Sequence, residues 1–207
     1  MNYLQLCQRL VIETGIADSG PAAVTGQVGD MKRVVDWVND SWLKIQSLRP
    51  DWKWMWSQTS TTLSSGTNTI TLAADVESIE GVRVDGDLIK RIPYETYAKY
   101  YYDRDSSKPI LYCIRPDGVV AFNTDADSNY TVTFDYYKVP EAFSAGTSTP
   151  GLPSRYHMLI VYDALRQYAQ FDEAQELERK AFTNYEDMLA DLSRDQLDEC
   201  KAPVYLA

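Results

Sequence analysis

The chain has 207 residues, of which 20 are Lys or Arg and 30 are Asp or Glu, so its formal net charge at pH 7 is −10. A chain of this length buries roughly 70% of its unfolded surface, which allows a hydrophobic core. The acidic balance argues against a surface that wraps DNA, because phosphate binding depends mainly on Lys and Arg. No apolar run approaches the roughly 20 residues that span a bilayer, and the first residues lack a secretory pattern, so we expect a cytoplasmic product without membrane contact.

Two amphipathic helices are predicted before residue 50. Apolar residues recur at helical spacing over residues 3–11, and Gly15 suits the end of that helix. After a connecting loop over residues 17–29, a second apolar stripe runs over residues 31–48 and ends before Pro50. Trp37 lies partly off this stripe, which points to contact with a neighbour.

The middle of the chain is predicted to be mainly antiparallel β-structure. Thr-rich segments at 57–63 and 69–72 flank a turn sequence at 64–68, which predicts a β-hairpin. Pro93 introduces a short helix within residues 93–103. The other strands are expected at residues 79–84, 88–92, 110–115, 119–122 and 130–137, with turns at 85–87 and 116–118.

Two more helices are predicted near the C-terminus. Apolar residues wrap most of the helix over residues 156–169, which indicates deep burial, whereas the last helix has a single apolar stripe over residues 177–192. The expected fold class is α+β: an α-helical bundle of two N-terminal and two C-terminal helices with a large central antiparallel β insertion. The expected divisions are a bundle of residues 1–56 and 152–199, an insertion of residues 57–151, and a C-terminal tail of residues 200–207.

The sequence contains no recognisable catalytic, cofactor or metal motif. Its one histidine, His157, stands at the start of a predicted helix without a nucleophile elbow, so we expect a partly buried, hydrogen-bonded side chain. Cys7, Cys113 and Cys200 are far apart and are interpreted as ordinary reduced thiols. The acidic run at 123–129 resembles a calcium loop, but Tyr130 stands where such a loop requires glycine. We therefore expect no catalysis, no cofactor and no metal.

Acidic residues gather in the last helical region. Residues 172–199 contain ten acids and three bases, a local balance of −7. This pattern fits a solvated helix face, or acidic helices that line a channel through which DNA passes without sticking. The candidate channel-facing acids are Glu186, Asp187, Asp191 and Asp195.

Aromatic residues cluster at 52–56 and 100–102. Such clusters can stack on sugars or bases, or they can pack in the core or against another subunit. The candidate subunit-interface residues are Trp37, Trp42, Trp52, Trp54, Tyr156 and Tyr185.

The order of these segments resembles the head-to-tail adaptor proteins of tailed bacteriophages. The best-matching segments are residues 34–54, with Trp-Val-Asn-Asp at 37–40 and Pro-Asp-Trp-Lys-Trp at 50–54, and residues 136–171, with Leu152-Pro153 and Tyr156-His157. The resemblance spans nearly the whole chain. It implies a structural protein in the neck of the virion that forms a ring of about twelve copies below the portal.

The resemblance also implies partners and sites. The ring would join the DNA-filled head to the tail and continue the DNA channel without binding DNA specifically. The implied partners are further copies of this chain, the portal protein, and tail tube, nozzle or fibre proteins, the last group facing the β insertion. The portal-docking tail would include Pro203, Val204, Tyr205, Leu206 and Ala207.

Two other classes of function stay open. A tail or fibre-attachment protein, or a carbohydrate-binding module, would use the aromatic β insertion, and partner binding that survives loss of the insertion would argue against it. A peptidoglycan-cleaving virion enzyme would use a pair of acids, but such pairs are expected by chance among 30 Asp and Glu residues. Abolition of cell-wall lysis by a single Asp or Glu substitution would identify that enzyme.

Overall fold

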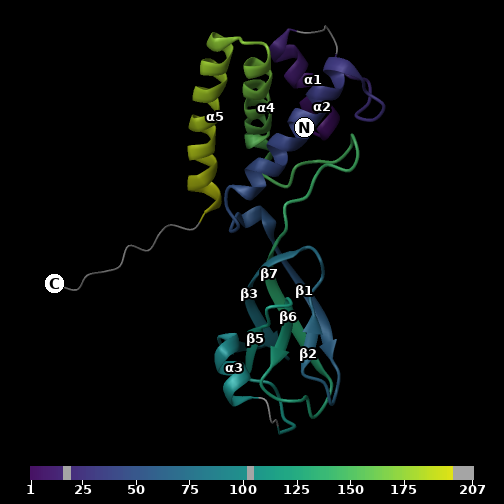
Figure 1. The fold of residues 1–207 in the computed structure, drawn as a ribbon, viewed down its shortest axis with the longest axis vertical. Coiled ribbons are helices and arrows are strands. Elements are labelled where there is room, and N and C mark those ends of the chain that lie inside the picture. Colours follow the sequence, from purple (N-terminus) through teal and green to yellow (C-terminus); the bar gives the residue numbers. More distant parts are fainter. Residues whose placement is uncertain (16–19, 102–104, 198–207) are drawn as a thin grey trace, which may run out of the picture. The chain divides into compact units, whose positions relative to one another are not determined.

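A computed structural model describes residues 1–15, 20–101 and 105–197 of the chain (Figure 1). These described residues form an α+β fold of five α-helices, two short 3-10 helices and seven β-strands. The chain divides into two compact units. Unit 1 comprises residues 1–54 and 140–207, and unit 2 comprises residues 55–139.

Unit 1 contains the four long helices that the sequence predicts. They are α1 (Tyr3–Thr14), α2 (Gly29–Ser47), α4 (Met158–Phe171) and α5 (Gln175–Gln196), with the 3-10 helix η2 (Ser154–Tyr156) before α4. A capping box between Asn2 and Gln5 begins α1, and the left-handed residue Gly15 ends it. A second 3-10 helix, η1 (Lys53–Met55), follows α2 in the chain.

The helix α4 is the most deeply buried helix of unit 1. It contacts α1, α2 and α5, and seven of its 14 residues are buried. The helix α5 packs on α4 but buries only Ala181, Tyr185 and Leu192 of its 22 residues. The predicted burial of the third long helix and the single stripe of the last helix are both confirmed.

Unit 2 is one seven-stranded sheet with the strand order β1-β7-β3-β4-β5-β6-β2. Its strands surround an apolar core that includes Val82, Phe122 and Phe134. The helix α3 (Tyr94–Tyr100) follows Pro93, as predicted, and places Tyr97 against Cys113 and Ala121. The strands are β1 (Trp56–Leu63), β2 (Thr69–Thr71), β3 (Val76–Val84), β4 (Asp87–Arg91), β5 (Leu111–Ile114), β6 (Val119–Phe122) and β7 (Tyr130–Lys138).

Two of the predicted turns connect antiparallel neighbours. The strands β3 and β4 pair through Asp85 and Gly86, which both have positive φ angles, as a tight hairpin turn requires. The strands β5 and β6 pair in the same antiparallel way. One pair, β4 with β5, is parallel, so the sheet is mainly but not wholly antiparallel.

The predicted hairpin between residues 57–63 and 69–72 is wrong. The strand β1 pairs with β7, and β2 pairs with β6. The residues between these two strands therefore do not form a hairpin turn. They bond to a distant loop instead: the Gly66 N–H donates to the Ala126 carbonyl at 2.7 Å, and the Ala126 N–H donates to the Thr67 carbonyl at 2.9 Å. These long-range bonds direct β1 and β2 to different neighbours.

The loop after β7 also differs from the expected division. The sequence places residues 140–151 in the insertion, but the structure places them in unit 1. Phe143 stacks on Tyr3 and Trp42, with ring centroids 4.6 and 5.5 Å away. The Gln46 side chain also donates to the Glu141 carbonyl and accepts from the Glu141 N–H. Packing on α1 and α2 therefore holds this loop.

Candidate functional site: interaction surfaces

Four of the six aromatic residues predicted for a subunit interface lie inside unit 1. Trp42, Trp52, Tyr156 and Tyr185 are each at most 8% exposed. The Trp52 indole N–H donates to the Ile45 carbonyl at 2.9 Å. These side chains form part of the core of one chain, and they leave little surface for a second copy. Trp54 is half-buried and stacks on Trp52.

Trp37 belongs to a partly exposed aromatic patch. Its ring centroid lies 6.0 Å from that of Tyr168 and 5.9 Å from that of Phe171. Phe171 is 53% exposed, and the Arg33 guanidinium lies 4.3 Å from the centre of its ring. We name Arg33, Trp37, Tyr168 and Phe171 the α2–α4 patch. Aromatic residues and Arg are enriched at protein interfaces, so this patch is a candidate contact surface.

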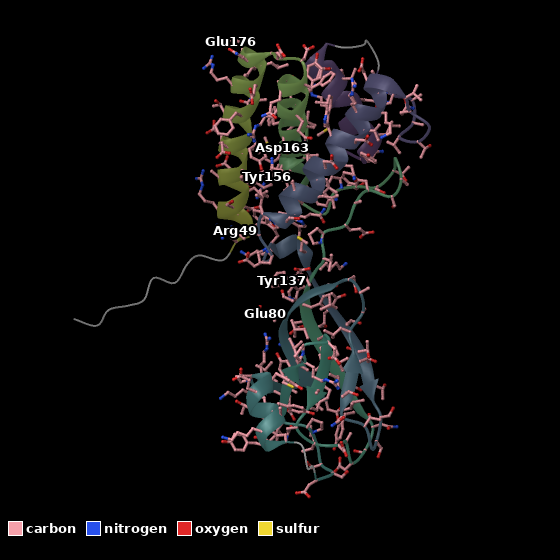
Figure 2. The ribbon with its side chains drawn as sticks, viewed as in Figure 1. Arg49, Glu80, Tyr137, Tyr156, Asp163 and Glu176 are labelled. Atoms are coloured by element: carbon pink, nitrogen blue, oxygen red, sulfur yellow. The ribbon has the colours of Figure 1, made fainter. Side chains whose placement is uncertain are left out.

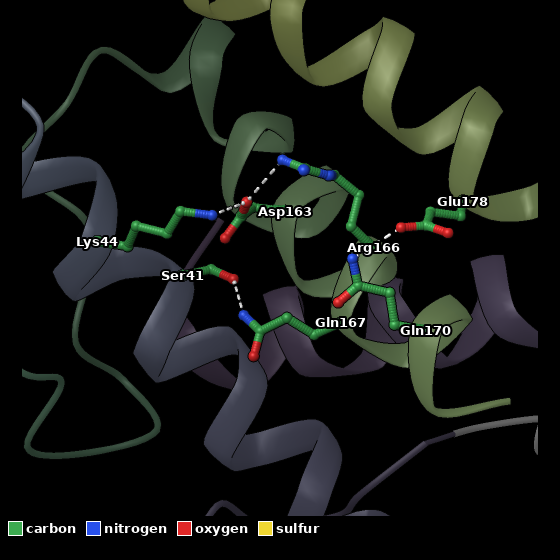
Figure 3. Close-up of polar contacts among 7 residues, drawn as sticks. All are labelled: Ser41, Lys44, Asp163, Arg166, Gln167, Gln170 and Glu178. Atoms are coloured by element: carbon green, nitrogen blue, oxygen red, sulfur yellow. Dashed lines mark hydrogen bonds and ion pairs between the residues drawn. The ribbon is translucent and has the colours of Figure 1, made fainter. Parts of the chain in front are cut away.

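A buried carboxylate joins α2 and α4 in unit 1 (Figure 3). Asp163 on α4 is 1% exposed, and its Oδ1 accepts from Lys44 Nζ on α2 at 2.6 Å and from Arg166 at 3.4 Å. The Arg166 guanidinium also lies over the rings of Phe182 and Tyr185 on α5, at 4.8 and 5.3 Å. We name Lys44, Asp163 and Arg166 the Asp163 cluster. Sequence reasoning missed it because Lys44 and Asp163 lie 119 positions apart.

Two further hydrogen bonds lie beside the Asp163 cluster. The Gln167 side chain donates to Ser41 Oγ on α2 at 3.0 Å, and the Gln170 side chain donates to Glu178 on α5 at 2.7 Å (Figure 3). Polar contacts therefore join α4 to both α2 and α5, in addition to the apolar packing.

His157 is buried and bonded at both ring nitrogens. The Met1 ammonium lies 2.6 Å from Nδ1, and the Leu152 carbonyl lies 3.2 Å from Nε2. Because an ammonium only donates and a carbonyl only accepts, the ring is neutral with its proton on Nε2. Burial and the nearby ammonium charge lower the pKa of His157 below its usual value. The predicted hydrogen bonding of this histidine is confirmed, and the side chain is more deeply buried than the partial burial that the sequence predicts.

A groove of about 730 Å³ runs beside α5 in unit 1. Figure 2 shows Tyr156 next to this helix, and the Tyr156 hydroxyl donates to the Asp191 carbonyl at 3.4 Å. We name this surface the α5 groove. Its lining residues are Arg155, Tyr156, Tyr162, Asn184, Asp187, Met188, Asp191, Arg194 and Asp195.

Three of the four predicted channel-facing acids line the α5 groove. Arg155 pairs with Asp195 at 2.5 Å, and Arg194 pairs with Asp191. Hydrogen bonds from Gln196 and Arg155 lower the pKa of Asp195. Asp187 is exposed and has no ion-pair partner among the described residues. The fourth acid, Glu186, is exposed outside the groove.

In unit 2, the strand β1 is an open edge of the sheet. It pairs with β7 in one continuous register, and no other strand among the described residues pairs with it. Of its eight residues only Leu63 is buried. The sequence from Trp56 to Leu63 contains no charged residue and no proline, which are the usual features that block edge-to-edge pairing. Backbone groups of β1 are therefore open to an added strand.

Polar side chains on three adjacent strands contact one another beside this edge. Gln58 on β1 donates to Asp135 on β7 at 2.7 Å, and Arg83 on β3 forms an ion pair with the same carboxylate. Although burial acts in the opposite direction, these hydrogen bonds lower the pKa of Asp135. These side-chain contacts link β1 to β7 and β7 to β3, next to the open edge.

The remaining predictions concern thiols, metals, membranes and the tail. Cys7 and Cys113 are buried, and burial raises the pKa of Cys7 to about 12, so Cys7 is a protonated thiol at neutral pH. Within the described residues, no group of three or more His, Cys, Asp or Glu side chains could hold a metal, and no helix is long and apolar enough to span a membrane. Cys200 and the predicted docking residues 203–207 lie outside the described residues.

Comparison with known families gives a match over nearly the whole chain. The family model described as SU10 adaptor protein matches residues 1–205, and it therefore covers both units. Among curated proteins, none matches the chain significantly. The extent of the family match is sufficient to show which family the chain comes from.

Proposed function

This chain belongs to the SU10 adaptor protein family, and we propose that it forms a ring below the portal of a tailed bacteriophage. The family indicates a structural adaptor of the virion that contacts other phage structural proteins. Our proposal adds a ring of about twelve copies in the neck, between the DNA-filled head and the tail. The ring would continue the channel through which the genome is ejected.

The observation that carries the proposal is the family match across residues 1–205. Two surfaces of unit 1 support the ring. The α2–α4 patch and the α5 groove involve different residues, so a contact between the patch of one copy and the α5 flank of the next would be heterologous. Heterologous contacts repeat from copy to copy and close into a ring when the rotation between copies allows it.

The charge on α5 supports a channel that does not bind DNA. Glu186, Asp187 and Asp191 are exposed, and the whole chain carries a net charge of −10. Acidic groups repel the phosphate backbone, so DNA would pass through a channel lined by these acids without being bound. We assign the protein no catalytic step and no cofactor.

The open edge of β1 supports a tail-side contact through unit 2. An extended segment of a tail tube, nozzle or fibre protein would add to β1 as a further strand, with main-chain hydrogen bonds supplying the affinity. The same observation favours the second candidate, a tail or fibre-attachment protein that does not touch the portal.

The test is the native mass of this protein mixed with the portal protein from the same genome. The full chain is compared with a truncation that lacks residues 200–207 and with a variant in which Gly and Ser replace those residues. A complex with about one copy per portal subunit, absent with both altered tails, supports an adaptor that docks through its tail. If neither the full chain nor the variants form a complex, the tail or fibre-attachment role becomes the better account.

A further inference from the structure

The turn that joins α4 to α5 has a backbone conformation that does not suit its sequence. After α4 ends at Phe171, the Ala174 N–H donates to the Ala169 carbonyl at 2.8 Å. This bond is typical of a Schellman motif, in which the residue before Ala174 is left-handed and is usually glycine. Here that residue is Glu173, with a φ angle of 55°. In this conformation the Cβ atom lies too close to the carbonyl oxygen that follows it, so the turn is strained.

Elsewhere the chain uses residues that tolerate this conformation. Among the described residues, the other positions with positive φ angles are seven glycines and Asp85, which lies in a hairpin turn. Gly15 ends α1 in the same left-handed conformation in which Glu173 follows α4. Glu173 is therefore the one described position at which a long side chain is held in a left-handed conformation.

The sequence of the turn favours a helix instead. Residues 171–177 read Phe-Asp-Glu-Ala-Gln-Glu-Leu, without Gly, Pro or Asn. Glu, Ala, Gln and Leu are strong helix formers. The start of α5 also lacks a good N-cap, since Ala174 stands there and no side chain caps it. Local preference therefore favours one helix over residues 158–196, and only the packing of α5 on α4 enforces the turn.

The contacts that enforce the turn lie between the two helices and not within the turn. Three buried residues of α5 face α4. The Arg166 guanidinium on α4 lies 4.8 and 5.3 Å from the ring centres of Phe182 and Tyr185, and the Gln170 side chain donates to Glu178 at 2.7 Å (Figure 3). Because these contacts need only an α4 and an α5, the α4 of a second copy offers the same contacts.

We propose that two copies of the chain exchange their α5 helices. In the exchanged form, residues 172–174 continue the helix from α4 into α5, and each α5 packs on the α4 of the other copy. The exchange relieves Glu173 and keeps the contacts between α4 and α5, and short strained connections favour such an exchange. Its cost is the association of two chains, so it depends on protein concentration. The exchange goes beyond the proposed ring, because it concerns copies of this chain alone.

The test mixes two chains that each carry one new cysteine at the contact between α4 and α5. One chain has Gln170→Cys and the other has Glu178→Cys, both in a Cys200→Ser background, while the buried Cys7 and Cys113 are kept. The mixture is held at about 1 mM, diluted to about 1 μM and treated at once with a short bismaleimide. We expect linked pairs of chains, with the link between positions 170 and 178 identified by peptide mass spectrometry.

Two controls make this result decisive. A chain with both cysteines, kept at about 1 μM, should be linked within one chain and shows that the reagent reaches both positions. A mixture made only after dilution measures links that arise from random collisions. The proposal is overturned if linked pairs are absent while the first control is linked, or if both mixtures give equal yields.

A glycine variant tests the role of the turn. Glu173→Gly, introduced into both chains, should lower the yield of linked pairs at least about fivefold, because glycine relieves the turn and weakens a continuous helix. The matched control is Glu176→Gly, which makes the same change in the first turn of α5, a segment that is helical in both forms, and should leave the yield unchanged. Equal effects of the two variants would overturn the proposal, and circular dichroism would verify that both stay folded.

The portal experiment described above gives an independent result. If linked pairs form but the portal binds no copy of the chain, only the proposed function fails. If a portal complex forms but no linked pairs do, only the exchange of α5 fails.

Discussion

The helices α4 and α5 are neighbours of opposite character. Half of α4 is buried, and it contacts three helices, whereas α5 buries three of its 22 residues. Apolar packing on several sides fixes α4. A thin apolar stripe and a few polar contacts hold α5, which leaves most of its surface and its acids available to partners. The comparison teaches that the long helix with the fewest buried residues in unit 1 is the one that leaves the most side chains exposed.

The largest effect is expected from the core of α4. Ile160 is fully buried, so Ile160→Ala should lower the free energy of unfolding by about 3 kcal/mol through lost burial and a cavity. Leu189 on α5 is half-buried, so Leu189→Ala should cost only about 1 kcal/mol. Urea unfolding followed by circular dichroism measures both values. Equal losses would mean that α5 is part of the core to the same extent as α4.

A smaller effect is expected from the Asp163 cluster. Asp163→Ala removes the shared acceptor of Lys44 and Arg166 and should cost about 2 kcal/mol, since Arg166 is largely buried. Lys44 is half exposed, so Lys44→Ala should cost less than about 1 kcal/mol. The same unfolding assay applies. A larger loss from Lys44→Ala than from Asp163→Ala would contradict the central role of the carboxylate.

His157, at the start of α4, should make the free energy of unfolding depend on pH. Because the folded chain lowers the pKa of His157, the unfolded chain binds more protons just below the usual histidine pKa. The contribution of this residue is therefore fully present above about pH 6.5 and is lost as the pH falls below it. Urea midpoints measured from pH 7.5 to 5 should fall less steeply for His157→Gln than for the parent chain. Parallel slopes would show that His157 does not titrate differently on unfolding.

The smallest effect is expected on the exposed face of α5. Glu186→Gln and Asp187→Asn should each change the free energy of unfolding by less than about 0.5 kcal/mol, because both side chains are exposed and neither has an ion-pair partner among the described residues. A larger loss in either variant would place that acid in a stabilising contact, and the contrast between the two helices would become weaker.

Local periodicity explains why the helices could be predicted from the sequence. The stripe that contains Ala181, Tyr185 and Leu192 has the spacing of one helix face, and the wrapped pattern of α4 shows burial on several sides. Pro93 and Gly15 likewise mark helix ends through their own backbone preferences.

Long-range pairing explains what could not be predicted. The sequence at 64–68 has the composition of a hairpin turn, but these residues bond to a distant loop through Gly66 and Ala126, and the two flanking strands do not pair. Phe143 belongs to unit 1 because of Tyr3 and Trp42, which are more than 100 residues away. Lys44 and Asp163 each look like ordinary charges on a helix face, and only the fold shows that they meet. The family resemblance pointed to the adaptor class, but it did not locate the α5 groove or the open edge of β1.

The division of the chain sets an order for its folding during synthesis. Unit 2 is one continuous segment, so it can fold as soon as residues 55–139 have left the ribosome. Unit 1 is interrupted, and the apolar faces of α1 and α2 have no α4 to cover them until residue 171 has been made. At ordinary synthesis rates this delay is on the order of ten seconds. The first 54 residues must therefore wait, with their apolar faces incompletely covered, while a complete β unit forms behind them.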